Sequence, residues 1–74
     1  MARHDRIEIR PEVMYGKPVI RGTRITVEQI LRKLAAGMTP EEIVRDHPRV
    51  IFDDIKAAQA FAADYLAAEE VEFA

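Results

Sequence analysis

The chain has 74 residues, no cysteine and a formal net charge of -2. This length predicts one small domain, 1–74, which buries only about 60% of its unfolded surface and is often stabilised by a second subunit. The lack of cysteine excludes disulfides and cysteine-based zinc sites, and no apolar run approaches the roughly 20 residues that cross a bilayer. We therefore expect a cytoplasmic protein with no signal peptide and no membrane contact.

The charge is unevenly distributed along the chain. Residues 1–34 carry eight basic and four acidic side chains, a net charge of +4, whereas residues 35–74 carry three and nine, a net charge of -6. This polarity suggests separate surfaces for separate partners, or head-to-tail self-association. Chance in a short chain is an equal alternative.

Residues 7–25 are expected to form an extended arm. Ile7 and Ile9 alternate with polar residues, which predicts a short, half-buried strand that ends at the next proline. The string GKPVIRGTRIT then begins at Gly16. Its two glycines predict turns whose geometry a side chain would block, and residues 18–20 predict a second short extended piece.

A first helix is predicted after the arm. Thr26 is a typical N-cap residue, and Gln29 three positions later completes a capping box. Gly37 occupies the position where a helix ends in left-handed backbone. The apolar face of this helix would contain Val27, Ile30, Leu31, Leu34 and Ala35.

Two further helices follow. Thr39, a proline and Glu42 form a second capping box, and Pro48 ends that helix early. Asp53 is expected to cap the third helix, with Asp54 in its first turn. The apolar face of the third helix would contain Ile55, Ala58, Phe61, Ala62, Tyr65 and Leu66.

These signals predict a mainly α fold. A short N-terminal β-arm (7–25) precedes a three-helix, helix-turn-helix-like bundle (26–68) of the homeodomain or winged-helix type, and an acidic tail (69–74) follows. The small size, together with a strand edge at Ile7 and Ile9, predicts a homodimer.

Enzyme chemistry has little support in the sequence. His4 and His47 lack the spacing of a metal site, and the glycines do not form a phosphate-binding motif. Adjacent aspartates at a helix start do not face one another, so capping explains them better than catalysis. We expect a protein that is not an enzyme and that uses no metal and no cofactor.

Nucleic-acid binding is better supported, because the second and third helices resemble a helix-turn-helix unit. However, Asp53 and Asp54 would repel phosphates at the leading end of the third helix, so the basic arm must supply much of the contact. Each cation taken singly is more often a solvated surface group. The candidate nucleic-acid-binding residues are Lys17, Arg21, Arg24, Arg32, Lys33, Lys56 and Gln59.

The strings GKPVIRGTRITVEQIL, LAAGMTPEEIVRDHPRV and DDIKAAQAFAADYL, in this order, resemble the bacterial family known as domain of unknown function 433. The resemblance covers roughly residues 7–66, and the GxPxxxGTR string is its most specific part. The family is similar to helix-turn-helix proteins. Some members resemble antitoxins of toxin–antitoxin pairs, encoded beside a PIN-like ribonuclease toxin.

Two hypotheses follow from these observations. The first is a homodimeric antitoxin that binds operator DNA and represses its own operon, with the basic arm and the first helix on the phosphates. The second is a protein-interaction module that neutralises a partner nuclease without binding DNA, by laying an acidic surface over a basic cleft. The candidate partner-binding residues of the second hypothesis are Asp64, Glu69, Glu70, Val71 and Phe73.

Overall fold

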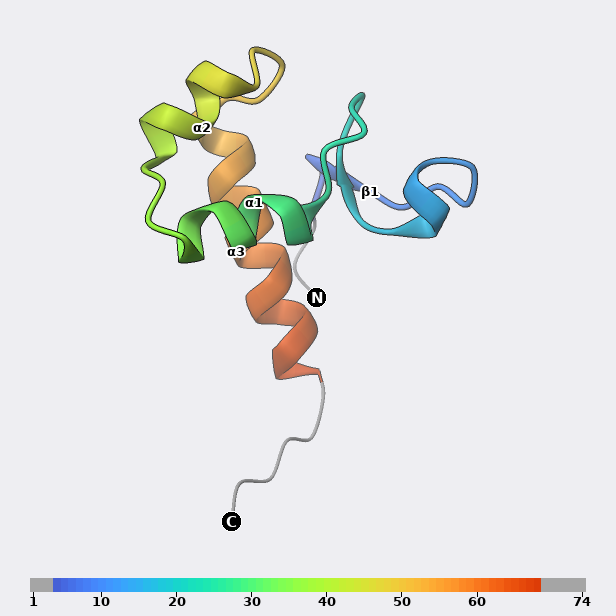
Figure 1. Cartoon of the computed structure of the whole chain (residues 1–74). Helices are drawn as coiled ribbons and strands as arrows, with labels where there is room; N and C mark the ends of the chain where they lie inside the picture. Colours follow the sequence, from blue (N-terminus) through green and yellow to red (C-terminus); the bar gives the residue numbers. More distant parts are fainter. Residues whose placement is uncertain (1–3, 69–74) are drawn as a thin grey trace.

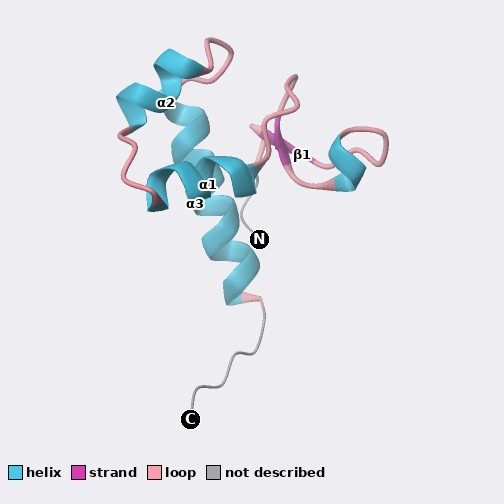
Figure 2. Ribbon diagram, viewed as in Figure 1, coloured by secondary structure: helices cyan, strands magenta, loops and turns pink. Residues whose placement is uncertain are grey.

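A computed structural model describes residues 4–68 of the chain. It is mainly α, and a two-stranded β-arm precedes three helices, which confirms the predicted fold class (Figures 1 and 2). α3 is the longest element; α1 crosses it and α2 lies at its N-terminal end (Figure 1). In chain order the elements are β1 (Ile7–Glu8), the 3-10 turn η1 (Met14–Gly16), β2 (Val19–Ile20), α1 (Val27–Ala35), α2 (Pro40–Asp46) and α3 (Phe52–Ala67).

The two strands of the arm are short and antiparallel. Ile7 lies opposite Ile20, and Glu8 lies opposite Val19. Both isoleucines of the first pair are buried, but Ile9 is 58% exposed. The prediction that Ile9 shares a buried face with Ile7 is therefore wrong. In the antiparallel register Ile9 would lie opposite Pro18, which precedes β2 and has no N–H to donate, so the pairing ends at Glu8.

Two turns of the arm have left-handed backbone. Gly22 follows β2 with φ +77°, and Gly16 closes η1 with φ +79°. A residue with a Cβ is strained in this region, so the predicted use of both glycines in turns is confirmed. Met14 and Tyr15 also have positive φ, at 48° and 58°. Tyr15 is a bulky residue in an uncommon conformation, and its side chain is almost fully exposed.

The caps of α1 follow the sequence in part. The Thr26 hydroxyl accepts a hydrogen bond from the N–H of Gln29 at 2.9 Å, so the predicted N-cap is confirmed. Within residues 4–68, no return bond from the Gln29 side chain accompanies it, and only half of the predicted capping box forms. At the other end, the N–H of Gly37 donates to the carbonyl of Leu34, as in a Schellman motif.

The predicted capping box of α2 is complete. The N–H of Thr39 donates to the Glu42 carboxylate at 3.0 Å, and the N–H of Glu42 donates to the Thr39 hydroxyl at 3.2 Å. Pro40 occupies the first helical position, where its missing N–H costs nothing. The backbone hydrogen bond from Thr39 holds the pKa of the Glu42 carboxyl below its usual value.

The start of α3 differs from the prediction. The helix begins at Phe52 and its N-cap residue is Ile51, so the expected cap at Asp53 is wrong. Asp54 provides the capping bond instead, because its Oδ2 accepts the N–H of Ile51 at 3.0 Å. Its Oδ1 accepts a hydrogen bond from Arg6 Nη1 at 3.2 Å, which joins the arm to α3. Asp54 is buried, and both of its carboxylate oxygens accept hydrogen bonds from the protein, which offsets the cost of removing this charge from water.

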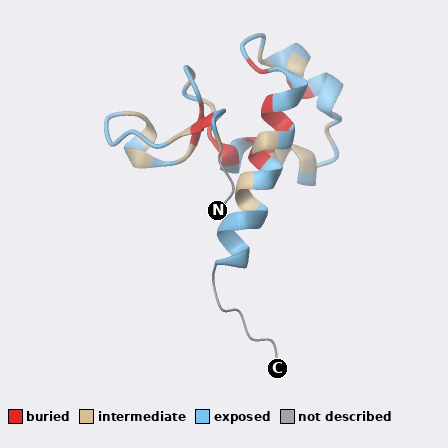
Figure 3. Cartoon of the chain, turned by 180° about the vertical axis from the view of Figure 1, so that it is seen from behind, coloured by how far each residue is buried: buried red, intermediate tan, exposed pale blue. Residues whose placement is uncertain are grey.

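The hydrophobic core lies where the first half of α3 meets the arm and the other two helices (Figure 3). Every contributing element places at least one aliphatic side chain there, as its amphipathic pattern predicts. The buried members of the core are Ile7, Ile20, Val27, Ile30, Ile43, Val50, Ile55 and Ala58.

The second half of α3 extends beyond this core. Tyr65 and Leu66 are 60% and 58% exposed, and Ala35 of α1 is also exposed. These three residues therefore form the exposed part of the predicted apolar faces. α1 has nine residues and crosses α3, so it covers α3 only as far as Phe61 and Ala62, which are half-buried (Figure 1).

The paired aspartates of α3 give a direct test of this arrangement. We expect Asp54→Ala to lower the free energy of unfolding by about 2 kcal/mol, because it removes a helix cap and an ion pair to a buried carboxylate. Asp53→Ala is the matched control, since Asp53 is exposed and its nearest contact with Arg6 is 3.6 Å long. It should change stability by less than about 0.5 kcal/mol. Equal losses for the two variants in urea titrations would contradict the assignment.

Candidate nucleic-acid interface

The turn after β2 presents two of the predicted basic residues to solvent. Thr23 builds the turn: its hydroxyl donates to the Ile20 carbonyl at 2.8 Å and accepts from the N–H of Ile25 at 3.0 Å. Arg21 and Arg24 flank Thr23 and are exposed. Within the described part of the chain, neither guanidinium has an ion-pair or hydrogen-bond partner, so both are available to a ligand.

A depression of about 460 Å³ lies beside this turn, and we call it the basic cleft. Arg10, Arg24 and Arg49 reach it from three separate segments, and Glu8 is its one carboxylate. The four charges sum to +2. The residues that line the basic cleft are Glu8, Arg10, Val13, Gly22, Thr23, Arg24, Ile25 and Arg49.

Hydrogen bonds fix the walls of the basic cleft relative to one another. Arg49 Nη1 donates to the Gly22 carbonyl at 3.1 Å, which joins the α2–α3 connection to the arm. The N–H of Gly22 donates to the Glu8 carboxylate at 3.1 Å, which ties the turn back to β1. Arg10 pairs with Glu12 through Nε at 3.0 Å. Because a guanidinium has five donors, Arg10 and Arg49 both retain N–H groups for a ligand.

The two candidates on α3, Lys56 and Gln59, are exposed. The expectation that Asp53 and Asp54 both repel a ligand at the start of this helix is wrong. Asp54 is buried against Arg6, and Asp53 lies 3.6 Å from the same guanidinium. Arg6 therefore neutralises one of the two negative charges at this end of α3 and removes one carboxylate from the surface.

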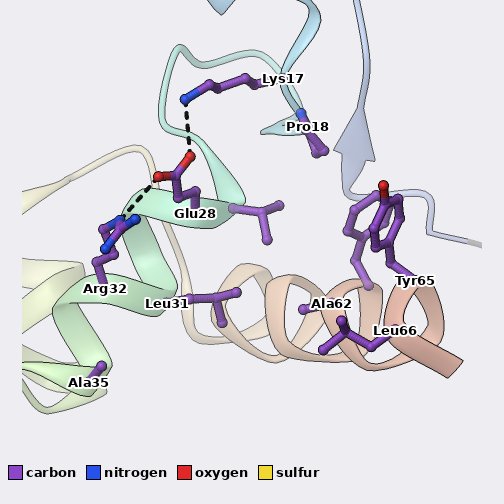
Figure 4. Close-up of a pocket in the computed structure, with 11 residues that line it drawn as sticks. Lys17, Pro18, Glu28, Leu31, Arg32, Ala35, Ala62, Tyr65 and Leu66 are labelled. Carbon is purple, nitrogen blue, oxygen red and sulfur yellow. Dashed lines mark hydrogen bonds and ion pairs between the residues drawn. The ribbon is translucent and has the colours of Figure 1, made fainter. Parts of the chain in front are cut away.

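The remaining basic candidates lie elsewhere on the molecule. Lys17 Nζ and Arg32 Nε both donate to the carboxylate of Glu28, each at 3.0 Å (Figure 4). Lys33 is half-buried on α1. The two ion pairs that Glu28 forms lie in the lining of a second depression, which shares no lining residue with the basic cleft. The structure thus divides the predicted single cluster of cations into two groups.

This second depression is mainly apolar, and we call it the apolar groove. Its volume is about 580 Å³, and it lies between α1, the arm and the second half of α3 (Figure 4). Hydrogen bonds from Lys17 and then Arg32 hold the pKa of the Glu28 carboxyl below its usual value. The groove is lined by Lys17, Pro18, Val27, Glu28, Leu31, Arg32, Ala35, Phe61, Ala62, Tyr65 and Leu66.

The candidate partner-binding residues are only partly visible. Asp64 Oδ2 lies 3.0 Å from His4 Nε2, and the His4 ring meets Phe61 edge-to-face with ring centroids 5.2 Å apart. Asp64 therefore holds the start of the described chain against α3, although its side chain stays half exposed. Glu69, Glu70, Val71 and Phe73 lie outside the described residues.

Three arginines that organise this surface were not among the predicted nucleic-acid-binding residues. Arg6 directly precedes β1, Arg10 lies two residues after it, and Arg49 follows Pro48 in the α2–α3 connection. The sequence did carry one signal for Arg49, since it lies in the connection of the predicted helix-turn-helix unit. The contact between Arg6 and Asp54 spans 48 positions, and no local pattern indicates it.

The structure adds two observations on other classes of site. Among residues 4–68, no helix is long and apolar enough to cross a membrane. In the same part of the chain, no three histidine, cysteine or carboxylate side chains come together as a metal site.

The fold and the basic cleft define a small, mainly α domain with an arginine-lined surface. The chain belongs to the family described as "Protein of unknown function (DUF433)", whose model matches residues 7–62. This match confirms the family resemblance seen in the sequence strings.

Two relatives illustrate this membership. The chain is 33% identical over 52 residues to "Uncharacterized protein y4eO" of Sinorhizobium fredii (strain NBRC 101917 / NGR234), and the match covers 70% of this chain and 24% of that protein. It is also similar to the crystal structure of a DUF433 member protein from Anabaena variabilis ATCC 29413, with a TM-score of 0.80 and 27% identity. That match covers 85% of this chain and 62% of the other. The chain thus spans less than two thirds of either relative.

The shared carboxylate of Glu28 predicts a pH dependence. Its folded pKa lies below the ordinary value of 4.5, so its ion pairs stabilise the fold above that pH. This contribution is lost as the pH falls through the folded pKa. We expect NMR titration to give a Glu28 pKa below 4.5 in the wild type, and a higher one in Lys17→Met. An unchanged pKa in Lys17→Met would show that the Lys17–Glu28 pair does not form in solution.

Proposed function

We propose that this protein binds DNA and that the basic cleft contacts backbone phosphates. The observation that carries the proposal is the convergence of Arg10, Arg24 and Arg49 from three segments on one depression. A guanidinium presents paired donors that match phosphate oxygens, and it keeps its charge at every physiological pH. The lining residues carry a net charge of +2, or +1 with the Glu12 carboxylate that pairs with Arg10, and this positive charge favours a polyanion over a neutral ligand.

The position of the basic cleft also supports this proposal. The cleft adjoins the connection between α2 and α3, the two helices that correspond to a helix-turn-helix unit. In such proteins the second helix enters the major groove while neighbouring segments hold the phosphates. α3 offers Lys56 and Gln59 on its exposed surface, and Arg49 precedes its first turn. We assign phosphate contact to the cleft and a smaller share of base contact to these two side chains.

The family resemblance extends the proposal to a biological role. We propose that the protein is an antitoxin-type autoregulator, which binds its own operator and neutralises a PIN-like ribonuclease. A binding function rather than a catalytic one fits this role. The alternative is a protein-interaction module that does not bind DNA.

The DNA-binding proposal predicts a specific effect of Arg24→Ala. Arg24 is exposed and, among the described residues, unpaired, so its removal should leave the fold intact. We expect the affinity for a labelled duplex from the region upstream of its own gene to fall by about tenfold in fluorescence polarisation at low salt. The slope of log affinity against log salt concentration should decrease in magnitude by about 0.9, the value for one lost phosphate contact.

Arg45→Ala is the matched control for this experiment. Arg45 is an exposed arginine of α2 that does not line the basic cleft, so the substitution changes the net charge equally. We expect its affinity to stay within about twofold of the wild type. Failure of the wild type to bind any duplex at low salt would contradict the proposal and favour the protein-interaction module. An unchanged salt slope in Arg24→Ala would remove the cleft from the interface.

The antitoxin role has its own test. We expect co-expression with the product of the adjacent gene to yield a stable complex and to relieve the growth defect that this product causes alone. Normal growth of cells that express the adjacent gene alone would contradict the antitoxin role, and it would leave the DNA-binding result unaffected.

A further inference from the structure

The apolar groove is the most prominent feature that the proposed function does not use. Its walls are the exposed side of α1 and the second half of α3, which projects beyond the core (Figures 1 and 4). Tyr65 and Leu66, both more than half exposed, form one edge of it. Contiguous exposed apolar surface of this kind on a small domain marks a place where another surface binds.

The second half of α3 is also poorly supported within one chain. The buried side chains of α3 end at Ala58, and only the partly buried Phe61 and Ala62 follow before the helix ends at Ala67. A helix gains most of its stability from packing of an apolar face, and its free end frays without such packing. Burial of Tyr65 and Leu66 against a second surface would supply the missing contact.

We propose that this second surface is the same groove of another copy of the chain. A two-fold dimer requires one patch that is complementary to itself, with both a projection and a recess. The apolar groove meets this requirement, because Tyr65 and Leu66 project from α3 beside the recess floored by Leu31 and Ala62 (Figure 4). In the dimer the second half of each α3 lies in the groove of the partner, and the two helices run antiparallel.

Charge complementarity supports a second copy as the occupant. The last turn of α3 contains no basic residue, so nothing on its own helix offsets the negative end of the helix dipole. The α1 side of the groove carries Lys17 and Arg32, which share the single carboxylate of Glu28. In the antiparallel arrangement the C-terminal end of one α3 approaches these two cations of the other copy, and their excess positive charge faces the negative end of its helix dipole.

This interface differs from the one that the sequence suggested. The strand edge at Ile7 and Ile9 offers little to a partner, since β1 has two residues and Ile7 is already paired with Ile20. Ile9 is as exposed as Leu66, at 58% each, but it does not line the groove. The two side chains therefore distinguish the two modes of dimerisation.

The test is the oligomeric state of the full chain and of two single variants. We expect sedimentation velocity to give twice the chain mass of 8.4 kDa for the wild type and for Ile9→Glu. For Leu66→Glu we expect a dissociation constant raised by about thirtyfold or more, which is the effect of replacing a residue at the centre of an interface. Circular dichroism establishes that each variant is folded, and both positions are exposed enough to accept glutamate.

A second measurement follows the groove itself. The chain has two tyrosines and no tryptophan, so Tyr15→Phe leaves Tyr65 as the one tyrosine. We expect acrylamide to quench its fluorescence less in the dimer than in the background of Leu66→Glu. A wild type of 8.4 kDa at every concentration, or a Leu66→Glu variant that dimerises like the wild type, would overturn the proposal. Loss of the dimer in Ile9→Glu alone would assign it to the strand edge instead.

Discussion

The fold depends on the contact between Arg6 and Asp54. A carboxylate that is buried without partners is strongly unfavourable, and here both of its oxygens are satisfied. One oxygen caps α3 through the N–H of Ile51, and the other accepts a hydrogen bond from the guanidinium of Arg6, directly before β1. The same carboxylate thus fixes where the longest helix begins and where the arm lies against it. The aliphatic core then fills the space that these two elements define.

The surface features follow from that placement. With β1 fixed against α3, the turn after β2 lies beside the α2–α3 connection, where Arg49 reaches the Gly22 carbonyl. The three residues of the Gly-Thr-Arg string have different roles. Gly22 provides left-handed backbone, the Thr23 hydroxyl holds the turn together, and the Arg24 side chain stays exposed. The string therefore forms a hydrogen-bonded turn that carries one exposed cation into the basic cleft.

The helices could be predicted from the sequence, because caps and periodicity act over a few residues. Thr39 with Glu42, and Gly37 at the end of α1, needed only local hydrogen bonds. The start of α3 could not be predicted, since Asp54 is chosen over Asp53 by a partner far away in the sequence. The basic cleft could be predicted only in part. Arg24 belongs to a distinctive local string, whereas Arg10 and Arg49 come close to it only through the tertiary fold.

The contact between Arg6 and Asp54 also has a consequence for the order in which the chain folds. The arm is synthesised before α3, yet its anchor lies on that helix. Closing a loop of 48 positions costs entropy that only the completed core offsets. The arm therefore takes its final position, with its strand and its arginines in place, only after α3 is made. Chains that lack α3 would therefore have no formed basic cleft.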